Sequence, residues 1–189
     1  MFKLLLFFWP KIGLSQREFF DYYEHRHAPL GARLTGGSVD YRRNYPIGDG
    51  RAPGEFWVIT EVWHDARAGL EAQIATRGST PVKETLNEDE AAFMDRERRL
   101  SVVVEECITH RSVAHDVSAP LEKLMRFVLV RDAEEAAAFR KQYEGHLQRG
   151  TRGFVHHIRN YPLDDPFTSP LLEVSGRRLA AVEELWRMA

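Results

Sequence analysis

Residues 19–30 combine aromatic, acidic and imidazole side chains at helical spacing. Phe20, Tyr23 and His27 lie three and four positions apart, so a helix places them on one face. A helix that buries aromatic rings does not ordinarily end its inner face with a titratable imidazole. We therefore predict that His27 acts as a general acid or base, with Tyr23 beside it. The alternative is a histidine that binds a backbone carbonyl at a helix end.

The first half of the chain contains the elements that would position these side chains. Ser15 and Glu18 have the spacing of a capping box, so we expect a helix from Ser15 to about His27. It is expected to end there because Pro29 disfavours the α conformation in the residue before it. The other expected elements are strands over residues 3–9, 39–47, 56–63 and 100–108, a helix capped by Asp65 and a helix over residues 81–95.

The second half of the chain repeats this pattern. Residues 159–162, Arg-Asn-Tyr-Pro, are identical to residues 43–46. Before this match we expect a strand over residues 123–130 and a helix over residues 133–148, and after it a short strand over residues 171–174 and a closing helix over residues 177–188. We therefore interpret the second half as a repeat of the first that lacks the last strand.

The order of the elements predicts the fold class. Each half begins β-α-β-β-α, which is the ferredoxin-like order, and its antiparallel sheet leaves one face bare of helices. We predict an α+β fold of two ferredoxin-like (βαββαβ) repeats whose antiparallel sheets pack into an α-β barrel. The expected domains are a first repeat over residues 1–110, a linker over residues 111–120 and a second, truncated repeat over residues 121–189.

The first half resembles the EthD family of dimeric α-β barrel proteins. The resemblance is carried by residues 14–19, Tyr23, His27-Ala28-Pro29-Leu30, Glu61-Val62-Trp63, and Asp89-Glu90 with Phe93-Met94-Asp95. It implies a cofactor-free barrel with a cavity between sheet and helices. It also implies a role in oxidative degradation, or in aromatic or polyketide metabolism as a monooxygenase, dehydratase or cyclase. The second half lacks the His-Ala-Pro-Leu sequence, so the resemblance places one site in the first half.

Several further side chains are candidates for contact with a substrate. Tyr23, Tyr45 and Trp63 would offer ring surface, and the tyrosines hydroxyl groups, to an aromatic molecule; the alternative is that they belong to the core. Arg43 lies on a predicted strand and needs a partner, which is either an internal carboxylate or a bound anion. No spacing of cysteine, histidine and carboxylate residues matches a known metal site, so we expect no metal.

The composition limits the classes of partner and the location. The chain has 189 residues, 43% of them hydrophobic, and a formal net charge of −2, which gives no basic surface for nucleic acid. The single cysteine, Cys107, fits a reducing compartment. The apolar run over residues 3–9 is too short to span a membrane and lacks the small residues of a cleavage site. We expect a cytoplasmic protein that binds neither nucleic acid nor membrane.

These observations favour one function and leave two others open. The favoured one is a cofactor-independent enzyme, monooxygenase-like or dehydratase-like, acting on a small hydrophobic molecule that is aromatic or polyketide-like. The alternative is a non-catalytic small-molecule-binding or accessory protein of a degradation pathway, and the third is a structural scaffold without a cavity. A homodimer is expected unless the internal repeat replaces it.

Overall fold

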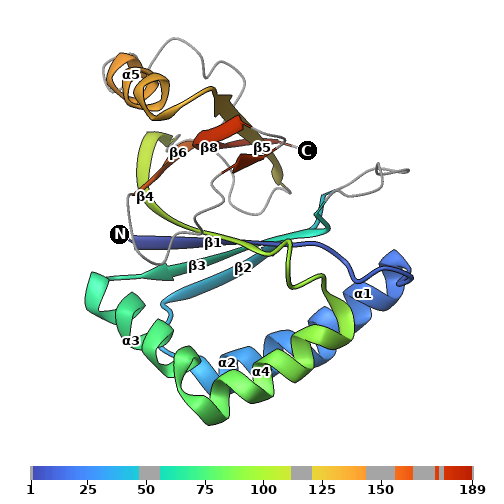
Figure 1. Ribbon diagram of the computed structural model, residues 1–189. Helices are drawn as coiled ribbons and strands as arrows, with labels where there is room; N and C mark the ends of the chain where they lie inside the picture. The colour runs from blue at the N-terminus through green and yellow to red at the C-terminus, as the bar shows by residue number, and fades with distance from the viewer. Residues whose placement is uncertain are drawn as a thin grey trace. The chain divides into compact units, whose positions relative to one another are not determined.

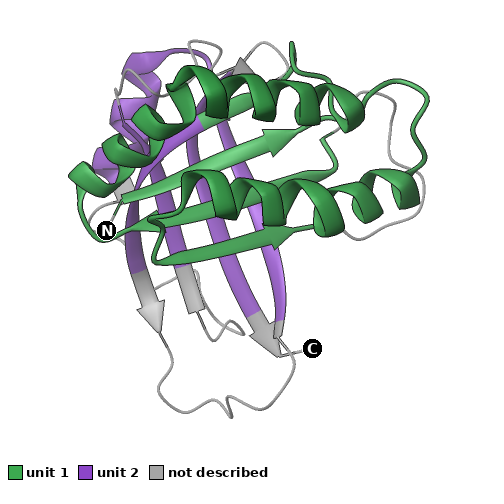
Figure 2. Ribbon diagram, turned by 90° about the horizontal axis from the view of Figure 1, so that it is seen from below, with its two compact units in different colours: residues 1–101 green, residues 102–189 purple. Residues whose placement is uncertain are grey.

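The chain divides into two compact units, Met1–Ser101 and Val102–Ala189 (Figure 2). The computed structural model describes residues 2–46, 56–111, 121–143, 156–163, 173–174 and 177–188. The linker predicted over residues 111–120 lies outside the described residues apart from Arg111. The boundaries predicted for the two repeats therefore stay a prediction.

The sheet of the first unit carries all of its helices on one face (Figure 1). The strands β2 (Asp40–Asn44), β3 (Val58–His64) and β1 (Phe2–Phe8) pair antiparallel in this order. The helices are α1 (Gln16–Tyr22), η1 (Tyr23–His27), α2 (Ala28–Thr35), α3 (Arg67–Gly78) and α4 (Thr80–Phe93). Within the described residues, none of the helices is long and apolar enough to cross a membrane.

The first helical segment starts where the sequence predicts and runs further than predicted. Ser15 and Glu18 form the expected capping box. The expected end near His27 is wrong, because α1, the π-helical turn η1 and α2 follow one another without a break. In the π turn the Ala28 N–H binds the Tyr23 carbonyl, five residues back. This wider turn accommodates Pro29, which has no N–H to donate and lies in the first turn of α2.

In the second unit the strands pair antiparallel in the order β4-β6-β8-β5. Its elements are β4 (Leu100–Arg111), β5 (Leu121–Val130), α5 (Ala133–Tyr143), β6 (His156–Pro162), β7 (Glu173–Val174) and β8 (Arg177–Met188). The short strand β7 pairs with β8. The α+β, ferredoxin-like class predicted from the sequence is confirmed by these elements.

The helix predicted over residues 177–188 is wrong, since this segment is the strand β8. Its alanine, leucine and glutamate residues favour a helix locally, but β8 pairs on one side with β5 and on the other with β6. Every residue from Leu179 to Leu185 is at most 5% exposed. An amphipathic helix would leave one face in solvent, whereas a central strand is buried on both faces.

Each unit buries a cluster of polar side chains in its sheet. In the first unit, Lys3 Nζ lies 2.6 Å from Glu61 Oε2, and Asn44 Nδ2 donates to Glu61 Oε1 at 2.6 Å. The corresponding residues of the second unit are Lys123, Glu184 and Asn160, with distances of 2.8 and 2.7 Å. We refer to these two trios as the lysine–glutamate clusters. Burial of charges on this scale requires their mutual pairing.

Candidate functional site

The first unit contains a cavity of about 540 Å³ between its sheet and its helices. The sheet contributes Leu4, Leu6, Phe8, Tyr41, Arg43 and Val62, and the helices contribute among others Tyr23, Glu24, His27, Ala28, Gln73, Ile74 and Arg77. The strand alternation explains the first set, because these side chains all point to the helix-covered face of the sheet. The lining is mainly apolar, with a few polar groups, as in pockets that hold small organic molecules.

His27 lines this cavity and is held by a carboxylate. Its Nδ1 lies 2.6 Å from Oδ2 of Asp89, which comes from α4, and both side chains are at least nine-tenths buried. Oδ1 of Asp89 accepts a hydrogen bond from the Tyr22 hydroxyl at 3.1 Å. A carboxylate can only accept, so Nδ1 carries the proton and the neutral imidazole has its lone pair on Nε2. Nε2 is therefore the nitrogen left for a bound molecule.

An aromatic shell fixes the orientation of the imidazole. The His27 ring centroid lies 4.9 Å from that of Phe93, 5.0 Å from that of Tyr23 and 6.0 Å from that of Phe8. The π turn keeps Tyr23 and His27, four residues apart, on the inner side of the helix, where they are 0% and 6% exposed. Phe19, one turn earlier, is fully buried too, so the inner line is Phe19, Tyr23 and His27. Phe20, predicted on this line, is only partly buried.

The Tyr23 hydroxyl is the second polar group directed into the interior of the unit. It lies 2.6 Å from Thr60 Oγ1 on β3 and 3.2 Å from the Tyr41 hydroxyl on β2. Burial raises the pKa of Tyr23 well above its ordinary value, and the neighbouring Tyr41 raises it further. The phenol of Tyr23 therefore keeps its proton at neutral pH and acts as a hydrogen-bond donor.

The positive charge of Arg43 is balanced by a carboxylate of the same unit. Its guanidinium donates from Nε and Nη2 to the two carboxylate oxygens of Glu24, each at 2.7 Å, and the Tyr45 hydroxyl donates to the same carboxylate. Burial alone would raise the pKa of Glu24, but the hydrogen bonds from Arg43 and Tyr45 outweigh it and lower that pKa. The hydrogen bond to Glu24 raises the pKa of Arg43. This bidentate pair is the internal salt bridge that the sequence allowed for Arg43.

The part of the chain that contains the cavity matches the model of a known domain family. Residues 11–97 match the model of the EthD domain family, and this range includes both His27 and Asp89. This chain carries an EthD domain. A search among curated proteins finds no match.

Solved structures similar to this chain fall into two groups by coverage. An ethyl tert-butyl ether D (EthD) family protein from Bacillus halodurans is 20% identical, with 57% of this chain and 99% of that chain covered, at a TM-score of 0.43. A dimeric protein of unknown function and ferredoxin-like fold from Bacteroides fragilis is 10% identical, with 55% and 94% covered, at 0.39. A proposed monooxygenase from Fusobacterium nucleatum is 9% identical, with 98% and 75% covered, at 0.51. This last likeness concerns the fold of the whole chain, and the EthD match concerns its first unit.

The structure brings together three of the five side chains predicted for the site. His27, Tyr23 and Arg43 line the cavity of the EthD domain. Tyr45 packs on Phe20, with ring centroids 4.4 Å apart, and is not among the lining residues. Trp63 points to the opposite face of the sheet, where Lys3 lies over its ring at 4.5 Å. The binding of a substrate by any of them stays a prediction.

Sequence reasoning missed Asp89, the partner of His27. In the sequence Asp89 stands out only within the EthD-like pattern, whereas in the structure it lies in α4, nine residues after the helix begins at Thr80. Glu90 is fully buried and pairs with Arg77 and Arg99. The available signal was the spacing of Asp89 and Phe93, four residues apart, which puts a carboxylate beside a buried ring on one helix face.

Metal binding has no evident site in the part of the chain that the structure describes. There, no group of three or more histidine, cysteine or acidic side chains is placed to hold a metal ion. His25 lies on the exposed side of the helix, away from His27. The arrangement in the EthD domain is instead one of an imidazole, a carboxylate and two phenols around an apolar space.

Proposed function

We propose that the EthD domain is a cofactor-independent enzyme in which His27 removes a proton from a carbon next to a carbonyl group of a hydrophobic substrate. The observation that carries this proposal is the 2.6 Å contact of His27 Nδ1 with Asp89 at the wall of a cavity of about 540 Å³. The carboxylate fixes the tautomer with a free Nε2 and stabilises the imidazolium that forms when Nε2 accepts a proton.

The proton transfer also needs a partner for the developing oxyanion. The electron pair of the broken C–H bond moves onto the carbonyl oxygen, which becomes an enolate. The buried Tyr23 hydroxyl and the Tyr41 hydroxyl beside it are two neutral donors in the lining and are suited to this oxygen. The enolate is the common starting point for attack on O₂, as in a monooxygenase, and for loss of a neighbouring hydroxyl group, as in a dehydratase.

The character of the lining supports a hydrophobic, aromatic or polyketide-like substrate. Cavities of roughly 300–1,000 Å³ hold small organic molecules, and the value of about 540 Å³ falls in this range. Phe8, Leu4, Leu6 and Val62 form the apolar wall on the sheet side. The charge of Arg43 is already balanced by Glu24, so we expect a neutral ring system rather than an acid to occupy this end of the cavity.

Deuterium exchange tests the proposed proton transfer without knowledge of the natural substrate. The aromatic ketone α-tetralone is incubated with the protein in D₂O, and loss of its α-proton signal is followed by NMR. We expect the wild-type protein to accelerate exchange above the buffer rate. His27→Ala and Asp89→Asn should each reduce the acceleration, His27→Ala by about 10²–10⁴-fold. The matched control is His25→Ala, which removes an exposed histidine two residues away and should leave the rate unchanged.

Two outcomes would contradict the proposal. The first is unchanged exchange in His27→Ala with its fold intact by circular dichroism. The second is α-tetralone that binds, as shown by shifted methyl resonances of Leu4, Leu6 and Val62, without any acceleration of exchange in the wild-type protein. The second result would favour the non-catalytic binding or accessory role instead.

We further propose that the second unit is a shortened copy of the first and carries no second histidine site. The matching lysine–glutamate clusters support this relationship, since Asn44 also donates to the Ile59 carbonyl and Asn160 to the Val182 carbonyl, each at 3.1 Å. A homodimer and a cytoplasmic location stay predictions. Size-exclusion chromatography with light scattering tests the first of these.

A further inference from the structure

Three arginines of the first unit share one buried carboxylate beside the cavity of the EthD domain. The carboxylate belongs to Glu90 of α4, which is fully buried. Its Oε1 accepts a hydrogen bond from Nη2 of Arg77. Its Oε2 lies 3.1 Å from Nη1 of Arg99 and 3.9 Å from Nε of Arg96. Three guanidinium groups are thus gathered around a single negative charge.

The positive charges of this cluster are only partly compensated. Partial burial lowers the pKa of Arg99, and the guanidiniums of Arg77 and Arg96 lower it further, although Glu90 acts in the opposite direction. The next carboxylate along α4, that of Asp89, is engaged with His27. A second anion close to the guanidiniums would therefore reduce their mutual repulsion.

Arg77 is the member of the cluster that reaches the cavity. Gln73, Ile74 and Arg77 lie on one face of α3 and line the cavity. Gln73 is held within the protein, because its Nε2 donates to the Gly36 carbonyl at 3.0 Å. In the described part of the chain, Arg77 binds Glu90 through Nη2 and forms no other hydrogen bond or ion pair, and its side chain is 35% exposed. The other N–H groups of its guanidinium are left for a bound molecule.

We propose that Arg77 binds the carboxylate of an amphipathic keto acid whose hydrophobic body fills the rest of the cavity. The keto group of this molecule rests on the function proposed above, whereas the acid group rests on the arginine cluster. The apolar wall of Leu4, Leu6 and Phe8 suits the body. A carboxylate matches better than a phosphate, because it is planar and singly charged and Arg77 is the one guanidinium of the cluster in the lining. The neutral ring system expected beside Arg43 and the acid group on α3 then belong to one molecule.

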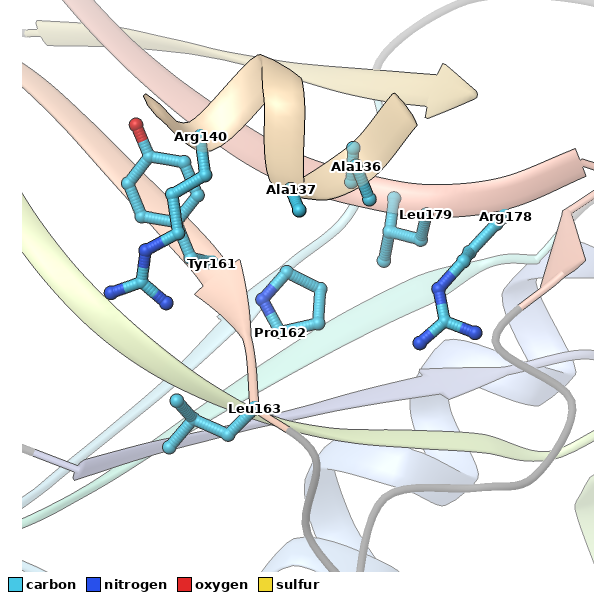
Figure 3. Close-up of a pocket in the computed structure, with 9 residues that line it drawn as sticks. Ala136, Ala137, Arg140, Tyr161, Pro162, Leu163, Arg178 and Leu179 are labelled. Atoms are coloured by element: carbon cyan, nitrogen blue, oxygen red, sulfur yellow. The ribbon is translucent and has the colours of Figure 1, made fainter. Parts of the chain in front are cut away.

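The cavity of the second unit is too small for such a molecule (Figure 3). Its volume is about 130 Å³, and it lies between α5 and the strands β6 and β8, below the range of roughly 300–1,000 Å³ that is usual for small organic ligands. Its arginines also have carboxylates near them, since Arg140 pairs with Glu105 and Arg178 lies opposite Glu173 in the β7–β8 register. We therefore expect the keto acid to bind in the first unit.

A charged and a neutral phenyl ketone test the proposal by methyl NMR of the full chain. β-Benzoylpropionate carries a phenyl ketone and a carboxylate, and β-benzoylpropionamide has nearly the same shape without the charge. We expect both to shift the methyl resonances of Leu4, Leu6 and Ile74, and the acid to bind at least tenfold more tightly than the amide at low salt. Arg77→Gln should remove this preference. Arg77→Lys, which keeps the charge but not the planar fork of donors, should retain part of it.

The matched control removes an arginine of the same helix outside the cavity lining. Arg67 is exposed and pairs with Glu71 four residues on, so Arg67→Gln should keep the wild-type preference for the acid. Equal affinities for acid and amide in the wild-type protein would overturn the proposal. A preference that persists in Arg77→Gln, with its fold intact by circular dichroism, would do so too. Inorganic phosphate that displaces the acid at a lower concentration than acetate does would overturn the assignment to a carboxylate.

Deuterium exchange of the same two ketones separates this proposal from the proposed proton transfer. Preferred binding of the acid without acceleration of exchange at the carbon next to its ketone would support the site at Arg77 and contradict the role of His27. Accelerated exchange of both ketones with equal affinities would support the role of His27 and contradict the site at Arg77.

Discussion

The two units carry similar side chains on one face of their sheets and different side chains on the other. On the first of these faces the lysine–glutamate clusters match, and a tryptophan ring lies under the lysine in both: Trp63 under Lys3 at 4.5 Å and Trp186 under Lys123 at 5.0 Å. On the helix-covered face, the first unit has a large apolar cavity with His27. The second has a small cavity with two arginines. Side chains that recur in both units therefore belong to the architecture, and those that do not recur are candidates for function.

One pair of strand positions on the helix-covered face shows how the two units differ there. Thr60 lies opposite Arg43 in the β2–β3 register, and Glu183 lies opposite Arg159 in the β6–β8 register. Thr60 binds the Tyr23 hydroxyl, whereas Glu183 pairs with Arg159 at 2.7 Å. The arginine of the second unit is thus held by a glutamate of the sheet, whereas in the first unit Arg43 pairs with Glu24 of the helix and Thr60 is left to bind the Tyr23 hydroxyl.

The largest expected effect on stability comes from a phenylalanine that is more deeply buried in the helix of the first unit than in that of the second. Phe19 in α1 is fully buried, so Phe19→Ala should lower the free energy of unfolding by about 3–5 kcal/mol. Its counterpart Phe139 in α5 is only partly buried, and Phe139→Ala should cost about 1–2 kcal/mol. Urea denaturation measures both. Equal losses would mean that α5 packs as tightly on its sheet as α1 does.

A second test concerns the lysine–glutamate clusters, which match in the two units. Lys3→Met removes the partner of the buried Glu61 carboxylate, which keeps its hydrogen bond from Asn44, so we expect a loss of about 3 kcal/mol. Lys123→Met should cost a similar amount, because Glu184 is as deeply buried and has the same kind of partners. The control is Lys83→Met, which makes the same exchange at an exposed position of α4 and should leave the free energy of unfolding nearly unchanged. A Lys123→Met variant with an unchanged free energy of unfolding would show that the two clusters are alike in geometry only.

The sequence predicted most of the first unit because its signals are local. The capping box at Ser15, the alternation along β2 and the aromatic and β-branched run of β3 each depend on neighbours in the chain. The prediction for β8 is wrong because its residues favour a helix and only pairing with β5 and β6 makes them a strand. The repeat of Glu61-Val62-Trp63 as Glu184-Leu185-Trp186 is the signal that identifies β8 as the counterpart of β3.

The candidate site was predictable only in part, since it depends on contacts between distant segments. His27 and Tyr23 stand out by their spacing on one helix. Asp89 lies 62 positions from His27, and nothing in its own neighbourhood distinguishes a buried partner of an imidazole from a surface acid. Trp63 is a candidate for the cavity because it is aromatic, but the alternation along β3 places it on the opposite face from Thr60 and Val62.

The pH dependence of stability tests the pair of Arg43 and Glu24 in the first unit. Arg43→Gln removes the guanidinium hydrogen bonds that lower the pKa of Glu24, leaves the one from Tyr45, and should cost about 1 kcal/mol at pH 7. A carboxyl group whose pKa is lowered on folding contributes stability above its unfolded value, about 4.3, and loses it as the pH falls through the folded value. The difference between wild type and Arg43→Gln should therefore be constant near neutral pH and shrink below about pH 4.

The corresponding variant of the second unit should cost more at neutral pH. Arg159 and Glu183 are both buried, so Arg159→Gln should lower the free energy of unfolding by about 2 kcal/mol, with Arg126 still paired to Glu183. Urea denaturation at several pH values measures both variants. A difference for Arg43→Gln that grows toward low pH would contradict the role assigned to Glu24.

The smallest expected effect tests a feature that the units have in common, the start of the helix after the first strand. Ser15 Oγ accepts from the Glu18 N–H at 3.3 Å, and Asp132 Oδ1 accepts from the Glu135 N–H at 2.8 Å. Ser15→Ala and Asp132→Ala should each cost about 1 kcal/mol, because each leaves a helix N–H without its acceptor. Ser15→Asp serves as control and should retain stability. Similar losses would place the caps with the shared architecture, and a loss for Ser15→Ala alone would show that α5 is held by its sheet contacts rather than by its cap.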